Sequence, residues 1–389
     1  MAGIKAYKCP ECGGPLEWNA VAQKMKCPYC DSVFTVAELE AIIGTKEEDA
    51  AETEAAAAKE EAAQAAGAQT TASEGVESNF DSVAWEDSHE YFSEEETAGM
   101  KVYSCNSCGA QIIAPETQGA MTCPYCNNNV VMVGQFAGDL KPDYIIPFKL
   151  DKEAAKAALK KHVSSRKFVP RIFSEKNHID EIKAIYVPYW LFSASAKVQA
   201  TFNATKTKTR RRGQTEYTDT EHYVLERGGT MDFEHVPADA SRNIADDLME
   251  SIEPFDFKDA VPFNAAYLAG FLADRYDVAM DECKQTAFSR MENSVRRAFN
   301  GLSGGYSSVT PVGYHIHFHK GTTDYALYPV WILNTSWNGG KYLFAMNGQT
   351  GKFVGDLPLD KGAFYRRWAL MAAAIGGIIY ALMWAFTWF

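Results

Sequence analysis

A short phrase built on two closely spaced cysteine pairs occurs twice in the chain. Each copy contains two C-x2-C pairs separated by 14 residues, and every cysteine of the second copy lies 96 residues after its counterpart in the first. The eight cysteines are Cys9, Cys12, Cys27, Cys30, Cys105, Cys108, Cys123 and Cys126. Two C-x2-C turns can present four thiolates to one ion, so each copy predicts a tetrahedral four-sulfur metal site.

Both sites are expected to be structural. Between the cysteine pairs lie short stretches of alternating apolar residues that fit small hairpins, a pattern typical of a zinc ribbon. Modules of roughly 30 residues bury too little apolar surface to fold unaided, so the metal would supply much of the folding energy. Four-sulfur geometry suits zinc and also iron; we expect two structural Zn²⁺ ions, with iron as the alternative. Four thiolate ligands leave no position for a catalytic water.

Disulfide and redox interpretations of the cysteines are less favoured. The N-terminus "MAGIKAYKCPEC" has no apolar signal-peptide core, so we expect the N-terminal part to stay in the cytosol, where disulfides are rare. Neither copy lies in a βαβ pattern that would indicate a thioredoxin. The ninth cysteine, Cys283, falls in a predicted helix and is expected to be an inert thiol.

The two ribbons, at residues 1–38 and 100–136, are separated by an acidic Ala/Glu-rich linker at 39–99, expected to be partly helical or disordered. Residues 46–100 carry 16 acidic and 2 basic side chains, against a net charge of −12 for the whole chain. The remainder is near neutral, without the overall basic field of nonspecific nucleic-acid binders. The linker ends in aromatic residues that would pack on the chain itself or dock a partner: Phe80, Val83, Trp85, Tyr91 and Phe92.

Residues 140–360 predict an α+β body of mixed antiparallel sheet and helices. Helices are expected at Asp151 to Val163 and at Met280 to Phe299. Two long antiparallel strands flank the polar turn "RRRGQ", and three further strands, "VTPVGYHIHFHKG", "YALYPVWILNTSW" and "KYLFAMNGQTGKFVGDL", are joined by glycine-containing turns. Similar short sequences occur before and within strands in both halves of this body. The alternative to a single domain is therefore a duplicated half-domain.

The C-terminal segment at 364–389 predicts one transmembrane helix. Trp368 to Phe389 are 22 residues without a charge, long enough as a helix to cross the hydrocarbon core. Lys361, Arg366 and Arg367 precede it, and the positive-inside rule places that flank in the cytoplasm. The sequence therefore predicts a membrane localisation with a single C-terminal span.

Two polar clusters in the body offer further chemistry. His315, His317 and His319 would share one face of a strand and could bind a metal, although a half-exposed strand shows the same alternation. The basic stretch Lys206 to Arg212 could contact phosphates, anionic lipid headgroups or the acidic linker, or simply be a solvated hairpin end. The sequence has no P-loop, G-x-S-x-G or H-E-x-x-H motif, so no catalytic residue is predicted.

The chain resembles a family of bacterial double-zinc-ribbon, membrane-anchored proteins. The resemblance rests on both ribbons and on the segments "LKPDYIIPFKLDKEAAKAALKKH", "YVPYWLF", "SIEPFDF", "YLAGFLADRYDV" and "NGQTGKFVGDLP". Members are labelled TFIIB-type zinc-ribbon proteins or likened to the primosomal replication-restart helicase. The resemblance covers nearly the whole chain. It implies a membrane-bound adaptor for SPFH-type or phage-shock-type membrane proteins.

The sequence therefore predicts a non-enzymatic, membrane-tethered cytoplasmic scaffold. Its ribbons and α+β body would bind protein partners, in the setting of a membrane-stress response that the resemblance implies. The alternative is a nucleic-acid-binding zinc-ribbon protein of replication or transcription, without motor activity, whose ribbons and basic hairpin contact phosphate.

Overall fold

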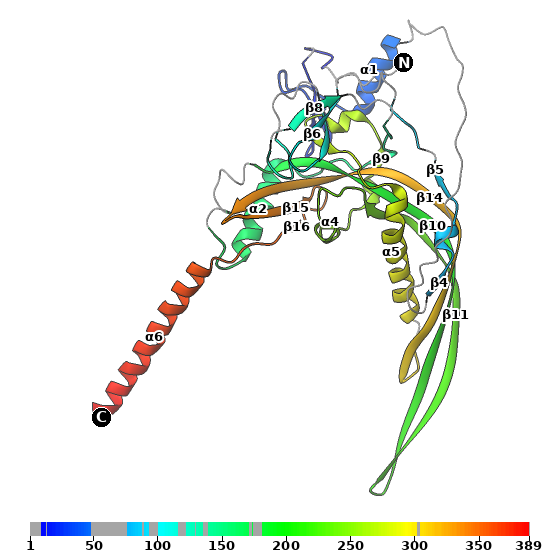
Figure 1. Cartoon of the computed structure of the whole chain (residues 1–389), viewed down its shortest axis with the longest axis vertical. Helices are drawn as coiled ribbons and strands as arrows, with labels where there is room; N and C mark the ends of the chain where they lie inside the picture. The colour runs from blue at the N-terminus through cyan, green and yellow to red at the C-terminus, as the bar shows by residue number, and fades with distance from the viewer. Residues whose placement is uncertain are drawn as a thin grey trace.

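A computed structural model describes the chain at residues 9–12, 14–47, 76–87, 89–92, 100–115, 122–128, 130–134, 139–170, 173, 181–301 and 304–388. The fold has a central body with two projections (Figure 1). One projection is the helix α6 (Lys361–Trp388), and the other is an arm formed by the far ends of three long strands. The predicted linker lies largely outside the described residues.

The body is organised around one antiparallel strand pair, β10 (Lys183–Arg212) and β14 (Ser308–Trp337). Their ladder runs from Lys183 opposite Ile332 to Thr205 opposite Ser308. They belong to a 13-stranded sheet with the path β12-β9-β14-β10-β13-β7-β6-β8. The remaining strands of that path are β12 (Val261–Pro262), β9 (Tyr144–Ile145), β13 (Leu272–Asp274), β7 (Gln111–Pro115), β6 (Met100–Cys105) and β8 (Val130–Gly134).

Off this path, β11 (Thr215–Asp239) pairs with β10, while β15 (Gly340–Asn347) pairs with β14 and with β16 (Phe353–Val354). The predicted hairpin at "RRRGQ" is confirmed, since β10 and β11 pair antiparallel around Gly213 and Gln214. A separate three-stranded sheet belongs to the first ribbon and contains β1 (Glu17–Asn19), β2 (Lys24–Lys26) and β3 (Val33–Phe34), followed by α1 (Val36–Glu47).

The burial pattern of β10 changes along its length. Ile185 to Phe192 are all buried, as expected for a strand covered on both faces. Beyond Ala194 the pattern alternates, with Ala196 and Val198 buried and Lys197 exposed, which indicates one covered face. The apolar run "IYVPYWLF" therefore lies inside the body, and the alternating run after it forms the arm.

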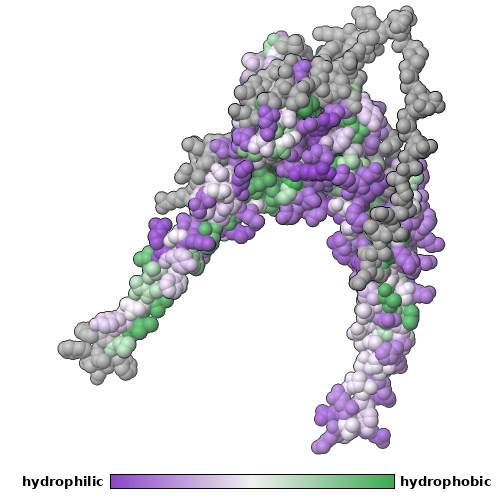
Figure 2. All heavy atoms as spheres, viewed as in Figure 1, coloured by the Kyte–Doolittle hydropathy of each residue, from purple (hydrophilic) through white to green (hydrophobic). Residues whose placement is uncertain are grey.

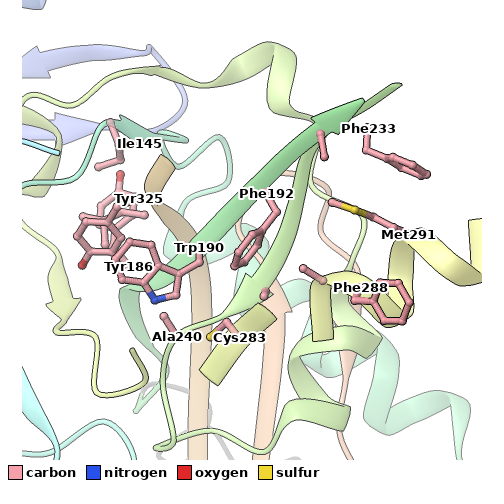
Figure 3. Packing of buried hydrophobic residues seen from close by; sticks show 14 of the residues in the cluster. Ile145, Tyr186, Trp190, Phe192, Phe233, Ala240, Cys283, Phe288, Met291 and Tyr325 are labelled. Carbon is pink, nitrogen blue, oxygen red and sulfur yellow. The ribbon is translucent and has the colours of Figure 1, made fainter. Parts of the chain in front are cut away.

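Helix α5 (Met280–Asn300) covers that apolar face of the arm and agrees with the predicted helix. Its buried residues recur at helical spacing and form one stripe: Cys283, Ala287, Phe288, Met291, Val295 and Phe299. Figure 3 shows Phe288 and Met291 on the same side of the sheet as Phe192 of β10 and Phe233 of β11.

Shorter helices complete the body. In α2 (Lys152–Ser165) the predicted apolar face is confirmed, because Ala155, Leu159 and Val163 are buried. Asp151 caps this helix by accepting a hydrogen bond from Ala154 N at 2.8 Å. The other elements are α4 (Asp246–Ile252) and the 3₁₀ turns η3 (Phe257–Asp259) and η4 (Ala265–Leu268).

The aromatic end of the linker packs on its own chain, which decides between the two alternatives left open by the sequence. Strands β4 (Val76–Ser78) and β5 (Trp85–Asp87) pair in parallel with β14, and η1 (Phe80–Ser82) lies between them. We call Val76–Asp87 the strap. Phe80 is 2% exposed and lies against Trp85, Phe288 and Phe318, with ring centroids 4.9–5.2 Å away.

The first two of the three predicted C-terminal strands form one continuous strand, so the predicted turn between them is wrong. Gly321 lies inside β14, opposite Trp85 of the strap. A Cβ atom at Gly321 would lie 2.6 Å from the Trp85 ring, so this glycine permits the close approach of an indole.

The predicted C-terminal transmembrane helix is wrong, and the predicted fold class and membrane localisation are corrected with it. Within the described residues, no helix is both long and apolar enough to cross a membrane. The described architecture is a large mixed sheet with helices.

We expect Phe80→Ala to lower the free energy of unfolding by about 3 to 5 kcal/mol, because it removes a buried ring from an aromatic cluster. Urea unfolding of the full chain, followed by tryptophan fluorescence, would measure the change. Tyr91→Ala is the control, since Tyr91 is 66% exposed and should leave the unfolding midpoint unchanged. Equal midpoints for wild type and Phe80→Ala would show that the strap contributes nothing to stability.

Candidate metal centres

The four cysteines of each copy converge on one point. Within each group, all four sulfur atoms lie within 4.8 Å of one another, and among the described residues only these two groups bring three or more metal-ligating side chains together. The closest Sγ–Sγ separations are 3.4 Å in the first group and 3.4 Å in the second. Sulfurs bound at about 2.3 Å around a tetrahedral ion lie about 3.8 Å apart. Each group could therefore hold a metal ion.

The same backbone turns position the thiols in both copies. In the first knuckles, Cys9 N donates to Gly14 O at 2.7 Å and Cys105 N donates to Ala110 O at 2.9 Å. In the second knuckles, the residue after the last cysteine has a positive φ, +60° at Asp31 and +59° at Asn127. Asp and Asn tolerate this left-handed conformation better than most residues.

The two knuckle tyrosines, Tyr29 and Tyr125, lie in very different surroundings although both belong to the phrase "CPYC". Tyr125 is 7% exposed and packs in the body, whereas Tyr29 is 74% exposed. The residue that follows the first knuckle, Gly14 in one copy and Ala110 in the other, accounts for part of this difference in exposure. Gly14 leaves room for the Tyr29 ring, because a Cβ there would lie 2.8 Å from Tyr29 Cδ2. The second copy has Ala110 at the equivalent position.

A buried carboxylate receives Tyr125. Its hydroxyl donates to Asp274 Oδ2 at 2.6 Å, and Ser241 Oγ donates to the same oxygen at 2.6 Å. Asn334 Nδ2 donates to the Tyr125 carbonyl, and Lys183 Nζ donates to the Cys123 carbonyl at 3.2 Å. We call Asp274, Ser241, Asn334 and Lys183 the receiving site of the second ribbon.

The second ribbon is also continuous with the body sheet. Its strand β7 pairs antiparallel with β13, with Ile112 opposite Asp274. The first ribbon keeps its own sheet and touches the body through Trp18, whose ring lies 4.7 Å from that of Tyr267 and whose Nε1 donates to Phe148 O at 3.5 Å. Loss of the first ribbon's fold would therefore leave the large sheet's ladder intact.

Comparison with known proteins adds a relative that matches part of the chain. The uncharacterized protein YdjG of Bacillus subtilis strain 168 is 32% identical to the chain over 232 residues, which are 60% of this chain and 68% of that protein. The chain belongs to the YdjG family. No family model matches the chain, and no solved structure matches it. The description of YdjG states no activity.

The three histidines of β14 share one face of the strand, as the alternation predicted. His315, His317 and His319 are exposed, and Ile316 and Phe318 between them are buried. His315 Nδ1 lies 3.0 Å from Glu77 Oε2 of the strap. Among the described residues, these histidines do not belong to any group of three or more converging metal ligands, so the half-exposed strand is the better interpretation.

Cys283 is buried under the arm, as its place on the apolar face of α5 requires. Its Sγ donates to Asp239 O at 3.2 Å, and burial raises the pKa of the thiol to about 12. A thiol with this pKa remains protonated at neutral pH, which agrees with the predicted inert cysteine.

Sequence reasoning missed the receiving site. Asp274 belongs to the phrase "FLADRYD", where one acidic residue follows an apolar run, and Lys183 begins a strand. Both positions look like ordinary ends of elements. Only the pairing of β7 with β13 brings Asp274 under the second ribbon, and no spacing rule relates residues so far apart in the chain.

Loss of metal from the two sites should have unequal effects. Cys27→Ser and Cys123→Ser change equivalent positions of the repeat, and each should remove one of two bound ions, as metal analysis would show. Because the second ribbon shares its sheet and Tyr125 with the body, Cys123→Ser should lower the unfolding temperature of the body by about 10 °C, equivalent to a few kcal/mol. Cys27→Ser should lower it by much less. Equal shifts in calorimetry would contradict this asymmetry.

Stability should also fall as pH rises. Burial raises the pKa of Asp274 to about 7 and that of Asp239 to about 8, from 3.8 for an ordinary aspartate. The folded chain therefore keeps protons that the unfolded chain has released, so the free energy of unfolding decreases from about pH 4 to about pH 8. Urea unfolding at pH 6 and pH 8, with zinc present, would show this decrease. Asp274→Asn should reduce it, and an unchanged slope would exclude Asp274 as its source.

Proposed function

We propose that this protein is a non-enzymatic, protein-binding scaffold in which two structural zinc ions fold the ribbons and the first ribbon presents its second knuckle to a protein partner. Cys9, Cys12, Cys27 and Cys30 would hold one ion, and Cys105, Cys108, Cys123 and Cys126 the other. Four thiolates complete the coordination of zinc, so the ion supplies folding energy and no activated water. Iron in the same sites is the alternative for the metal.

The observation that supports this proposal is the contrast between Tyr29 and Tyr125. In the second ribbon, the "CPYC" knuckle docks in the body and its tyrosine hydroxyl meets a buried carboxylate at 2.6 Å. In the first ribbon, the same knuckle leaves Tyr29 74% exposed. An exposed tyrosine on a rigid metal-bound turn is well suited to a protein interface, because little conformational freedom is lost when it is buried.

The receiving site indicates what chemistry the partner would offer. It supplies Asp274 as acceptor for the tyrosine hydroxyl and Lys183 as donor near the knuckle. The first ribbon has Asp31 where the second has Asn127. The first knuckle would therefore favour a cationic side chain on its partner more strongly than the second knuckle does. Asp31 pairs with Lys26 at 2.8 Å, and both groups are exposed enough to exchange partners.

The nucleic-acid alternative receives less support from the arm. In the β10–β11 register, Lys206 lies opposite Glu221 and Lys208 opposite Asp219. Lys208 is 3.8 Å from Glu221, and Arg210 pairs with Asp219. A phosphate would have to displace these carboxylates, so the basic stretch is largely balanced by its own hairpin.

Tyr29→Ala should remove partner binding without loss of metal. In affinity capture of the full chain from its native cells, the wild type should recover a reproducible protein, and Tyr29→Ala should recover about tenfold less. Tyr91→Ala, which removes another exposed tyrosine, is the matched control. Metal analysis on the same samples should give two ions for all three. Undiminished recovery with Tyr29→Ala, or no protein captured by the wild type, would refute the proposal.

A further inference from the structure

The outer edge of β11 is an open sheet edge. Of the strands that the structure describes, only β10 pairs with β11. Their register runs without a shift from Arg212 opposite Thr215 to Ala194 opposite Phe233. The hairpin therefore extends well beyond the body (Figure 1) with one row of backbone groups that no described strand pairs. Long open edges of this kind are templates for pairing with another strand.

The turn decides which residues face outward. Gly213 and Gln214 form a two-residue loop, and residues flanking such a loop exchange backbone hydrogen bonds. Thr215 and every second residue after it therefore point their N–H and C=O groups at β10. The even-numbered residues from Glu216 to Glu226 point their N–H and C=O groups away from β10. Val224 is one of them, so it offers both of its backbone groups to a new strand.

This edge lacks two of the common protections against pairing, lysine side chains and a proline near its middle. β11 contains no lysine, and its proline, Pro237, lies near the body end of the strand. Val224, near its middle, is 68% exposed, and His222 and Glu226 on either side are also exposed. An exposed valine on an open edge favours strand addition over solvation.

We propose that β11 pairs antiparallel with β11 of a second copy, around a two-fold axis at Val224. In this register Val224 faces its own equivalent, Glu221 lies opposite Arg227 of the second copy, and His222 lies opposite Glu226 of the second copy. Symmetry produces each of these two pairs twice. Tyr223 lies opposite Leu225 of the second copy, which adds aromatic to aliphatic contact. Isologous pairing of this kind closes on itself and gives a dimer.

Neighbouring registers are poorer. An axis at Tyr223 places His222 opposite Val224 and Glu221 opposite Leu225, so the Glu221–Arg227 and His222–Glu226 pairs are both lost, although Asp219 then meets Arg227. An axis at Leu225 places His222 opposite Gly228. In the proposed register, the complementary stretch ends where Glu216 would face Asp232, since like charges repel. Charge pattern and exposed valine thus select the same axis.

The two copies would extend one continuous sheet. An axis perpendicular to the sheet keeps equivalent faces on the same side, so α5 of both copies would cover one face. The other face near the axis carries polar side chains of β11 and β10, including His222 and Thr205, which lie opposite each other. Figure 2 shows pale to hydrophilic colours over much of the arm, as expected where the edge rather than the face makes the contact. This inference does not rest on the proposed role of Tyr29.

Sedimentation equilibrium of the purified, metal-loaded full chain would test the dimer. The wild type should dimerise with rising concentration. Val224→Lys and Val224→Glu each place like charges face to face at the axis and should raise the dissociation constant about tenfold or more. An equimolar mixture of the two variants should recover the association, because lysine then faces glutamate. Val312→Lys is the matched control, since Val312 is an exposed valine of β14 in the same arm.

Each outcome decides the inference. Dimerisation of the wild type and of Val312→Lys, its loss in each Val224 variant and its return in the mixture would support the β11 interface. A wild-type chain that stays monomeric at high concentration would overturn it, even if another protein binds this edge. Failure of the mixture to associate, or equal weakening by Val312→Lys, would overturn the register at Val224.

Discussion

The antiparallel ladder between β10 and β14 is the interaction on which the rest of the fold depends. It joins two 30-residue strands, and most other elements attach to one of them. β11 and β13 pair with β10, while β9, β15 and both strands of the strap pair with β14. Inside the body both faces of the pair are buried, and beyond Ala194 only the face under α5 is. A single strand pair thus forms both the core of the body and the spine of the arm.

Duplication of the four-cysteine module has produced two different relationships with that sheet. The second copy continues the sheet through β7 and β13 and buries Tyr125 on Asp274. The first copy keeps a sheet of its own and leaves Tyr29 exposed. Both second knuckles have the same backbone turn, so the difference lies in what surrounds each knuckle. In the first copy the tyrosine lies over Gly14, and in the second it lies in a pocket made by the body.

Local patterns predicted the elements that depend on near neighbours. The apolar stripe of α5, the face of α2 and the "RRRGQ" hairpin follow from helical and strand periodicity and from turn residues. Errors came where a distant contact overrides a local preference. Gly321 looked like a turn residue, yet it lies inside β14 because Trp85 of the strap approaches its backbone. The strap itself follows a run of small and acidic residues, and its place on β14 could not be read from that composition.

The sequence by itself determined the two four-cysteine groups, since spacing within a C-x2-C turn and the repeat of that turn fix which thiols can share an ion. It also determined the alternation that exposes His315, His317 and His319. Only the tertiary structure decided whether each four-cysteine module docks its second knuckle in the body. Whether a knuckle tyrosine is buried or exposed depends on Asp274, Asn334 and Lys183, which lie far from it in the chain. Hydrogen bonds between such distant residues form only when the sheet has brought their strands together, so no local pattern encodes them.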